Sequence, residues 1–206
     1  MSSPAVDAAL ARYRREHDRY LELADTVASR CRSLAAEADI PAAVQWRVKS
    51  PERVRAKLER LAPSPAGAAN GQALDALGDL AGVRVATYLE ADREPVVEAI
   101  RHGFRDVVVE VKDQPGSFYR ATHCQVWLFD ADAPGLAPEV LGLCCEVQVC
   151  SLLAQVWNEV EHGFVYTRAD PPSPAERAAL DALGRLTEAG DALVSLLVRP
   201  DSPVLP

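Results

Sequence analysis

One stretch, from Leu141 to His162, constrains the fold of this 206-residue chain more than any other, because its periodicity changes half-way. Apolar residues alternate with polar or small ones over 141–150, which is the pattern of a β-strand with one buried face. After Ser151, a suitable helix N-cap, the apolar residues fall at helical spacing as far as Val160. The chain must therefore place a half-buried strand directly before an amphipathic helix.

Glu146 lies on the polar face of that predicted strand, where a carboxylate is disfavoured unless the face is solvated or takes part in function. A solvated sheet face and a functional one explain this segment equally well. Only the rest of the chain can decide between the two interpretations.

The remaining pattern predicts an α+β fold, in which a mixed β-sheet of about five strands is flanked by helices. We expect one domain over residues 1–206, with its core at 44–167 and a flexible loop at 62–72. The expected strands are 44–48, 83–89, 105–112, 121–129 and 141–150. The expected helices are a long N-terminal one at 5–38, then 51–61, 92–103 and 152–160, and a long C-terminal one at 174–198.

The composition excludes several classes of protein. A hydrophobic fraction of 49% and a charged fraction of 25% are ordinary for a globular protein, and no window is apolar enough to span a membrane. The N-terminus has no basic segment followed by an apolar core, so we expect no signal peptide and a cytoplasmic protein with no membrane partner. The five cysteines include no C-x-x-C pair, which argues against disulfides and a structural zinc.

The net charge of −8 is unfavourable for nonspecific binding to nucleic acid, which usually needs a basic surface. The charge is uneven, however, because one segment is rich in cations. These are Arg47, Lys49, Arg53, Arg55, Lys57 and Arg60. Such a local anion site on an acidic protein suits a nucleotide better than a long polymer.

Three predicted strands place polar side chains on one face, which indicates that this face forms the floor of a cleft while the other packs on helices. These side chains are Arg84, His123 with Gln125, and Glu146 with Gln148. Asp79 lies just before one of the strands. Together with Glu146 it supplies two carboxylates, the minimum for holding Mg²⁺ against a nucleoside triphosphate.

Cations and one aromatic side chain complete this set. Positive charge for phosphates would come from Arg47, Lys49, Lys57 and Arg84. Tyr119 offers a stacking face for a base. The sequence contains neither a P-loop nor a G-x-G-x-x-G motif, which excludes the common phosphate-binding loops. Each residue alone also has a structural explanation, since a lysine or arginine is often a solvated charge and Asp79 could cap a turn.

Four segments resemble, in order, the motifs of one known family: the synthetase domain of RelA/SpoT proteins in its short single-domain form, the small alarmone synthetases. The segments span residues 47–166, and although each is a weak signal, the four together are specific. The matching positions are Arg47, Lys49 and Lys57 in RVKSPERVRAK; Asp79, Gly82 and Arg84 in DLAGVRV; Lys112, Tyr119, Arg120 and His123 in KDQPGSFYRATH; and Glu146, Gln148, Trp157, Glu161, His162 and Tyr166 in EVQVCSLLAQVWNEVEHGFVY.

The resemblance implies a nucleotidyltransferase-like synthetase fold and pyrophosphoryl transfer with Mg²⁺ as the cofactor. ATP would give its β,γ-pyrophosphate to the 3′-hydroxyl of GDP or GTP, forming (p)ppGpp and leaving AMP. By motif, Asp79 would hold Mg²⁺, and Glu146 would help to bind it and activate the acceptor hydroxyl. Such a transfer depends mainly on positioning and charge neutralisation, which these residues can supply.

The same motifs imply the binding residues. Arg47 and Arg84 would sandwich the adenine of ATP, while Lys49 and Lys57 would contact its phosphates. Tyr119 would stack on the acceptor base. The other acceptor-binding residues implied by the resemblance are Lys112, His123 and Gln148.

Departures from the family pattern fall mostly on the acceptor side. The donor side is intact, so we expect the chemistry to be retained while the identity of the acceptor stays open. The substitutions are Arg53 for serine, Phe118 for glycine, Ala121-Thr122 for Ser-Leu and Cys150-Ser151 for Arg-Thr.

Other functions stay open beside the synthesis of (p)ppGpp. Some small relatives are toxins that pyrophosphorylate the 3′ end of tRNA or make adenosine alarmones. A third interpretation is a degenerate domain that binds nucleotide without catalysis, against which the retained Asp79 and Glu146 argue. As protein partners, a second copy of the chain in a homo-oligomer and an antitoxin both stay open.

Overall fold

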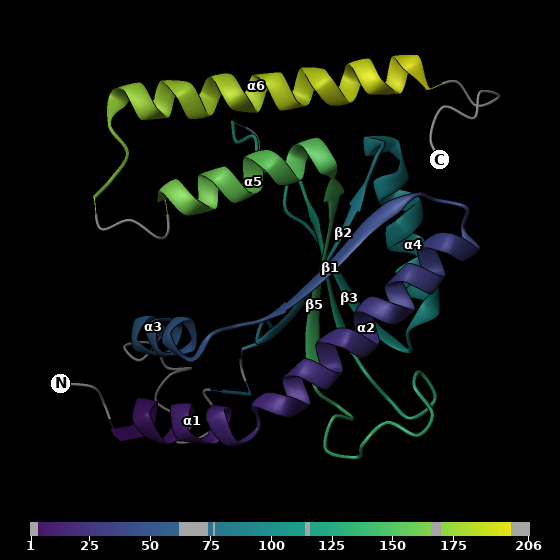
Figure 1. The fold of residues 1–206 in the computed structure, drawn as a ribbon, viewed down its shortest axis with the longest axis vertical. Helices are drawn as coiled ribbons and strands as arrows, with labels where there is room; N and C mark the ends of the chain where they lie inside the picture. Colours follow the sequence, from purple (N-terminus) through teal and green to yellow (C-terminus); the bar gives the residue numbers. More distant parts are fainter. Residues whose placement is uncertain (1–3, 62–73, 76, 114–115, 166–169, 199–206) are drawn as a thin grey trace.

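A computed structural model describes residues 4–61, 74–75, 77–113, 116–165 and 170–198 of the chain. At its centre is a five-stranded mixed sheet in the order β1-β2-β5-β4-β3 (Figure 1). The strands are β1 (Ala42–Val48), β2 (Ala81–Thr87), β3 (Asp106–Val111), β4 (Thr122–Trp127) and β5 (Cys144–Ser151). The helices are α1 (Pro4–Arg15), α2 (His17–Glu37), α3 (Pro51–Leu61), α4 (Arg93–Gly103), α5 (Leu152–Val165), α6 (Pro174–Leu197) and the short 3₁₀ helix η1 (Glu90–Asp92). The predicted α+β fold is confirmed.

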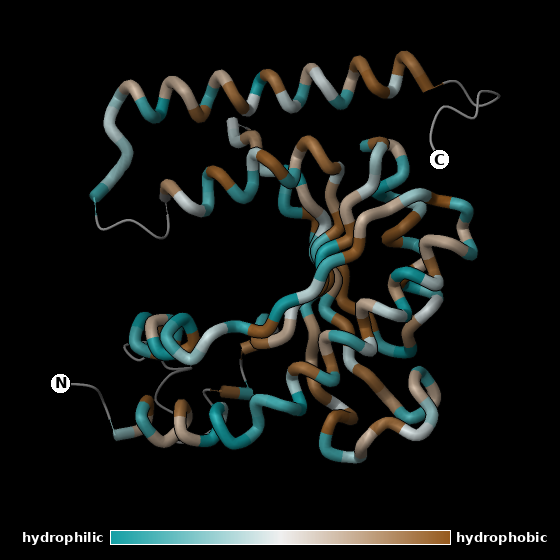
Figure 2. The backbone as a smooth tube through the Cα atoms, in the orientation of Figure 1, coloured by the Kyte–Doolittle hydropathy of each residue, from teal (hydrophilic) through white to brown (hydrophobic). Residues whose placement is uncertain are grey.

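The last strand in the sequence, β5, occupies the middle of the sheet. It pairs in parallel with β2 and antiparallel with β4, while β1 and β3 form the two edges. Val147 and Val149 are fully buried on one face of β5, whereas Glu146 and Gln148 are half-buried on the other. Figure 2 shows the same alternation of hydrophilic and hydrophobic residues along the central strands. The predicted alternation therefore separates a core face from a polar face.

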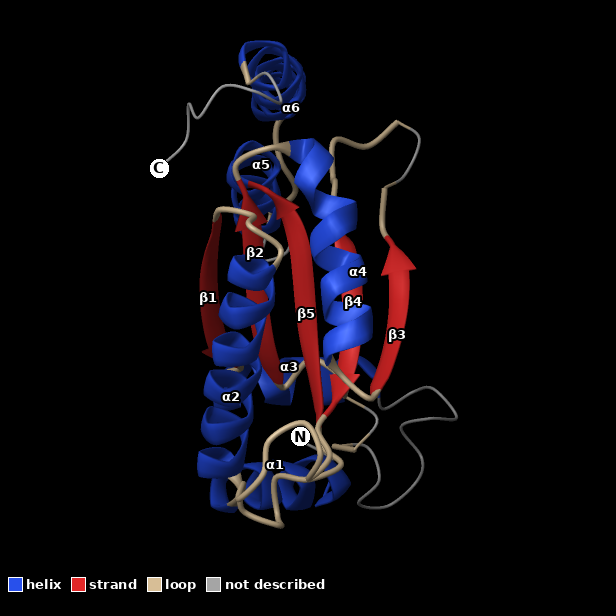
Figure 3. Cartoon of the chain, turned by 90° about the vertical axis from the view of Figure 1, so that its right-hand side faces the viewer, coloured by secondary structure: helices blue, strands red, loops and turns tan. Residues whose placement is uncertain are grey.

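Helices α2 and α4 cover the core face of the sheet, and the polar face is turned towards α3 and α5 (Figures 1 and 3). Val27 of α2 and Val97 of α4 are fully buried against the strands. The long helix α6 packs on α5. Within the described part of the chain, no helix has the length and apolar character needed to cross a membrane.

The N-terminal helix differs from the sequence prediction, because the single helix expected at 5–38 is two helices that meet at an angle at Glu16 (Figure 1). The backbone of Glu16 departs from helical geometry (φ −98°, ψ 6°). Its carboxylate pairs with Arg12 in α1 and with Arg19 in α2. The bend lets α1 pack on α3 while α2 packs on the sheet. The buried Tyr13 secures α1 by donating a hydrogen bond to the carbonyl of Lys49.

The other element boundaries shift by a few residues at most. β1 begins at Ala42 rather than at 44, and β5 begins at Cys144 rather than at 141. The later start of β5 has a local cause, since Gly142 adopts a φ of 76° that a strand residue does not take. The predicted caps are confirmed: Ser151 Oγ accepts from the amide of Ala154 at 3.0 Å, and Ser173 begins α6 with a capping box.

All five cysteines have free thiols, as expected, and four of them lie in strands. The predicted flexible loop at 62–72 and the matched Tyr166 lie outside the described residues. The domain limits expected from the sequence stay a prediction.

Candidate active site

A cleft on the polar face of the sheet consists of two adjoining cavities of about 460 and 650 Å³, with a smaller one of about 90 Å³ at the floor. The two large cavities share Arg47, His123, Gln148 and His162. All ten residues proposed from the sequence line this cleft: Arg47, Lys49, Lys57, Asp79, Arg84, Lys112, Tyr119, His123, Glu146 and Gln148. Gln125, predicted on the same face, instead packs beneath the turn at Gly78. The roles assigned to the ten residues stay predictions.

Asp79 lies in the turn before β2 and accepts hydrogen bonds from two lysines. Lys49 Nζ, just after β1, and Lys57 Nζ, on α3, each lie 2.6 Å from Asp79 Oδ2. Burial alone would raise the pKa of Asp79, but the two ammonium groups hold it below its usual value. The second oxygen, Oδ1, is buried and makes no hydrogen bond with any described residue. The carboxylate is therefore ionised, with one oxygen left for a further cationic partner.

Glu146 ends a chain of hydrogen bonds that crosses the cleft floor. Tyr119 Oη lies 2.8 Å from His123 Nε2, and His123 Nδ1 lies 3.2 Å from Glu146 Oε1. Gln148 Nε2 donates to the other oxygen of Glu146 at 2.7 Å. A neutral imidazole with its proton on Nδ1 satisfies both contacts, because it accepts from Tyr119 and donates to Glu146.

The surroundings of these hydrogen-bonded side chains keep the carboxylate of Glu146 charged and the phenol of Tyr119 neutral. Burial would raise the pKa of Glu146, but the hydrogen bonds from His123 and Gln148 outweigh it and hold the pKa below its usual value. Burial raises the pKa of Tyr119, and the nearby charge of Glu146 adds to the effect. At neutral pH the cleft therefore presents a base, Glu146, held in place by a protonated tyrosine and a histidine.

The two arginines predicted to hold the adenine come from neighbouring strands, β1 and β2, and both line the smaller of the two large cavities. Arg84 forms an ion pair with Glu159 of α5. Glu159 is not among the site residues predicted from the sequence. A signal was available, because Glu159 and His162 stand one helical turn apart on the helix that directly follows the strand of Glu146.

Charge is unevenly divided along the cleft. The 650 Å³ cavity is lined by the cations Arg47, Lys49, Arg53, Lys57 and Arg60. Burial and the charges of Arg47 and Arg53 lower the pKa of His162, which lies between the two cavities. In the 460 Å³ cavity, Arg84 and Lys112 are each paired with a glutamate, Glu159 and Glu110. Phosphates are therefore favoured in the larger cavity, and flat uncharged rings in the smaller one.

No cluster of three or more metal-binding side chains occurs among the described residues. Asp79 and Glu146 nevertheless line the same two cavities, and the charge of Asp79 acts on the pKa of Glu146. Mg²⁺ commonly takes one or two protein carboxylates and completes its shell with water and substrate phosphates. The unpartnered Oδ1 of Asp79 fits an ion of this kind, shared with a bound nucleotide.

Comparison with known proteins decides the family. Residues 46–170, more than half of the chain, match the model of the region found in RelA/SpoT proteins. The chain belongs to the RelA/SpoT family. A search of curated proteins gave no match for this RelA/SpoT chain.

Solved structures share the fold of this RelA/SpoT chain at low identity. Small alarmone synthetase 1 from Bacillus subtilis has a TM-score of 0.69 at 17% identity, over 91% of this chain and 96% of that one. Small alarmone synthetase 2 from the same organism has a TM-score of 0.69 at 20% identity, over 90% and 97%. A GTP pyrophosphokinase family protein from Streptococcus pneumoniae gives 0.67 at 19%, over 90% and 92%. Synthetase 1 has also been solved with its product pppGpp and with AMPCPP.

The departures from the RelA/SpoT pattern have identifiable places in the structure. Arg53 lines the larger cavity. Cys150 is buried in a small cluster with Ala121, and burial raises its pKa to about 11. The ring of Phe118 packs edge-on against Trp157 of α5, with 6.0 Å between the centroids. The substitutions at 118 and 150 therefore change the packing behind the cleft, while the one at 53 adds a cation to it.

Proposed function

We propose that this chain is an ATP-dependent pyrophosphokinase, which transfers the β,γ-pyrophosphate of ATP to the 3′-hydroxyl of GDP or GTP to form (p)ppGpp and AMP. The observation that supports it most is the hydrogen-bonded chain from Tyr119 through His123 to the ionised Glu146, in the same cleft as Asp79 and its lysines. Family membership supports the same chemistry, as does the likeness to a synthetase solved with pppGpp and with AMPCPP.

On the donor side, ATP would bind with its phosphates in the larger, cationic cavity. Lys49 and Lys57 would exchange Asp79, 2.6 Å away, for the phosphate oxygens. The adenine would lie between Arg47 and Arg84, since a guanidinium is flat, permanently charged and stacks well on an aromatic ring. Lys49, Lys57 and Arg84 thus already have carboxylate partners that a nucleotide can replace.

Mg²⁺ is the cofactor that fits these residues. Asp79 and Glu146 would hold the ion, with Asp79 Oδ1 as the buried oxygen that has no other partner among the described residues. When bound, such an ion neutralises charge on the phosphates during transfer. Lys49 and Lys57 contribute to the same neutralisation from the other side of Asp79.

The transfer itself is a displacement at the β-phosphorus of ATP. The acceptor 3′-oxygen forms a bond to that phosphorus, while the bond from it to the α,β-bridging oxygen breaks and AMP leaves with the electron pair. The proton of the acceptor hydroxyl passes to Glu146, which His123 and Gln148 keep oriented and ionised. Tyr119, fixed by its hydrogen bond to His123, lies on the acceptor side of this carboxylate.

Guanosine nucleotides are the acceptors that we favour over tRNA. Tyr119 lines the same 460 Å³ cavity as Arg47 and Arg84, and its ring can stack on the acceptor base. A net charge of −8 is unfavourable for a polyanion, whose binding depends on many contacts between cations and phosphates. Transfer to tRNA or to an adenine nucleotide is an outcome that the following experiment can detect.

The test is parallel incubation of the protein with Mg²⁺, ATP labelled at its γ-phosphate, and GDP, GTP, unlabelled ATP or deacylated tRNA as the acceptor. We expect label in guanosine tetra- or pentaphosphate, together with an equal amount of AMP. Label in RNA or in an adenosine product alone would reject the guanosine acceptor. Absence of AMP with every acceptor would reject catalysis and favour a nucleotide-binding domain.

Asp79→Asn tests the carboxylate directly. We expect AMP release to fall by roughly 10²–10³-fold, because the variant loses the charge that would hold the metal ion. Asp75→Asn is the matched control, since Asp75 pairs with Arg12 at 2.8 Å outside the cleft. Full activity in Asp79→Asn, or an equal loss in both variants, would contradict the assignment.

A further inference from the structure

The segment that carries Tyr119 is anchored to the last helix of the chain, α6. We call residues 117–121 the acceptor segment. Phe118, the residue before Tyr119, has its ring against Trp157 and against α6. A Cβ placed on Gly184 of α6 would lie 2.2 Å from Phe118 Cγ and 2.7 Å from Phe118 Cβ, far inside contact distance. Glycine weakens a helix interior, so its place here is explained by the close approach of Phe118.

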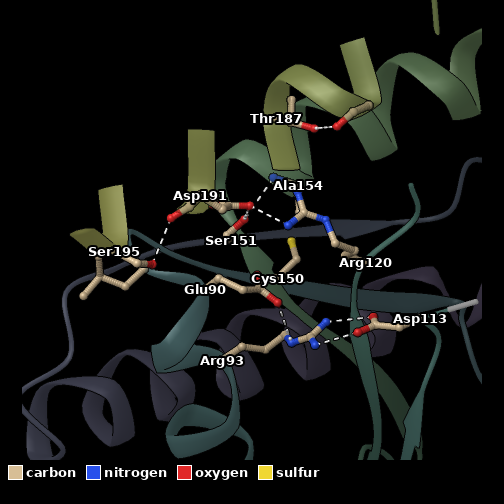
Figure 4. A network of polar contacts seen from close by, with 12 residues as sticks. Glu90, Arg93, Asp113, Arg120, Cys150, Ser151, Ala154, Thr187, Asp191 and Ser195 are labelled. Carbon is tan, nitrogen blue, oxygen red and sulfur yellow. Dashed lines mark hydrogen bonds and ion pairs between the residues drawn. The ribbon is translucent and has the colours of Figure 1, made fainter. Parts of the chain in front are cut away.

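A buried ion pair forms the second anchor. Arg120 Nη1 lies 2.8 Å from Asp191 Oδ2 of α6, and the two side chains are 14% and 4% exposed. The same oxygen of Asp191 accepts a hydrogen bond from Ser151 Oγ at 2.9 Å, and Ser151 caps α5. Figure 4 shows Ser151 and Arg120 both turned towards the carboxylate of Asp191. Removing one partner of a buried ion pair leaves an unpaired charge, so this contact strongly restrains Arg120.

The two anchors act on one short stretch of backbone. Gly184 and Asp191 are two helical turns apart, which places them on the same buried face of α6. Their partners, Phe118 and Arg120, flank Tyr119 in the sequence. Tyr119 lines the cleft while its two neighbours contact α6.

The far end of the acceptor segment is held independently. The amide of Ala121 donates to Asp113 Oδ1 at 3.1 Å, and Arg93 binds both oxygens of Asp113 at 2.8 and 2.7 Å (Figure 4). This end is therefore fixed to α4 and the sheet, whereas the end with Tyr119 is held by His123 and by contacts with α5 and α6.

We propose that Gly184 and Asp191 are positioning residues for the acceptor: by holding Phe118 and Arg120 they aim the ring of Tyr119 at the acceptor base. The inference rests on the proposed function, in which Tyr119 binds that base. It gives α6, which lies beyond the matched region 46–170, a part in acceptor binding. It also explains how a phenylalanine is accommodated where the family pattern has glycine, because α6 supplies the missing space at Gly184.

Gly184→Ala is the first test. The added Cβ forces Phe118 to move by about 1 Å, and a displacement of that size at a binding group can change rates by roughly a hundredfold. We expect the KM for the acceptor to rise about ten- to a hundredfold, with the Kd for ATP unchanged. Gly163→Ala in α5 is the matched control, because a Cβ there has no atom within 4 Å. An unchanged acceptor KM in folded Gly184→Ala would overturn the proposal.

A double-mutant cycle guards against a general loss of structure. Phe118→Gly removes both the ring and the Cβ that Gly184→Ala would meet. Phe118→Gly alone should raise the acceptor KM, and adding Gly184→Ala to it should change the KM no further. If the two effects multiply instead, the contact between Phe118 and Gly184 does not transmit the effect and the proposal fails.

Asp191→Asn tests the second anchor. The amide keeps an oxygen for Ser151 but loses the charge that binds Arg120, so the acceptor KM should rise while the Kd for ATP stays the same. Asp181→Asn, an exposed position on the same helix, is the control. An equal change in acceptor KM and ATP Kd would indicate a purely structural role.

Hydrogen exchange separates failure of this inference from failure of the proposed function. Gly184→Ala and Asp191→Asn should speed amide exchange in the acceptor segment and leave β2 unchanged, whether or not the wild-type protein transfers pyrophosphate. Faster exchange without any catalysis in the wild type would keep the anchoring and reject the reaction. Unchanged exchange in both variants would reject the anchoring, whatever the reaction.

Discussion

Glu146→Gln separates the chemistry of the cleft from its architecture. Glutamine has the shape of glutamate, so its oxygen can still accept from His123 Nδ1, which lies 3.2 Å away. It cannot take a proton from the acceptor hydroxyl at neutral pH. Loss of a general base lowers rates by roughly 10²–10⁴-fold, and we expect the kcat for AMP release to fall within that range.

The same substitution has a predictable effect on stability. Hydrogen bonds to a charged group contribute about 1.5–3 kcal/mol and neutral ones about 0.5–1.5 kcal/mol, and Glu146 has two such bonds, from His123 and Gln148. Relief from burying a charge offsets part of the loss. We therefore expect the free energy of unfolding to fall by on the order of 1 kcal/mol at pH 7.

The sign of the pH dependence follows from the pKa of Glu146, which lies below its usual 4.5 in the folded protein. The ionised carboxylate therefore stabilises the fold above pH 4.5, and this contribution is lost as the pH falls through the folded pKa. Glutamine does not titrate. The difference in stability between wild type and Glu146→Gln should accordingly shrink in acid.

The assays are AMP release at saturating ATP and acceptor, and urea unfolding at pH 7 and in acid. Glu98→Gln is the control, because Glu98 lies on α4, across the sheet from the cleft, and pairs with Arg101. A kcat within threefold of wild type would refute the role of Glu146 as the base, and a stability difference that grows in acid would refute the pKa argument.

Three further outcomes are expected. Arg84→Ala should weaken ATP binding by about tenfold or more in calorimetry, since water does not replace a stacked guanidinium, and an unchanged affinity would contradict the donor assignment. Burial raises the pKa of Cys144 to about 12, so its alkylation at pH 8 should be about a thousandfold slower than in urea, and equal rates would show that the thiol is not held as described. Ser173→Ala removes the capping box of α6 and should lower the free energy of unfolding by about 1 kcal/mol in thermal melts. An unchanged free energy of unfolding would contradict the stabilising role of this cap.

Much of the fold could be predicted because its signals are local. The switch from alternation to helical spacing at Ser151, and the capping residues of α6, depend only on neighbouring side chains. The bend at Glu16 has no such signal, since the apolar stripe continues across it and the rings of Tyr13 and Tyr20 still meet, 5.4 Å apart. What bends the chain there is packing against a distant helix, α3, which periodicity does not report.

In the candidate site, too, the features with local sequence signals could be predicted and those that depend on long-range packing could not. Motif spacing identified the ten residues that line the cleft, because the residues of each motif lie close together in the sequence. Their partners could not be predicted. The pairing of Arg84 with Glu159 and that of Arg120 with Asp191 each join segments far apart in sequence, and only the folded chain brings them together. Phe118 in particular is an unexplained departure from the family pattern in the sequence, and the structure explains it by the space that Gly184 leaves for its ring.

The position of β5 has a consequence for how the protein is made. β1 and β2 form one half of the sheet and β3 and β4 the other, and the two halves are joined only through β5, the last of the described strands to be synthesised. Asp79 stands at the start of β2 and Glu146 on β5, so the two carboxylates cannot meet in a nascent chain that has not yet left the ribosome beyond β5. Pairing of this kind is non-local and correspondingly slow to form. A nascent chain without β5 would therefore carry Asp79 and the cations for a nucleotide but lack Glu146, and could begin to act only after β5 had emerged from the ribosome.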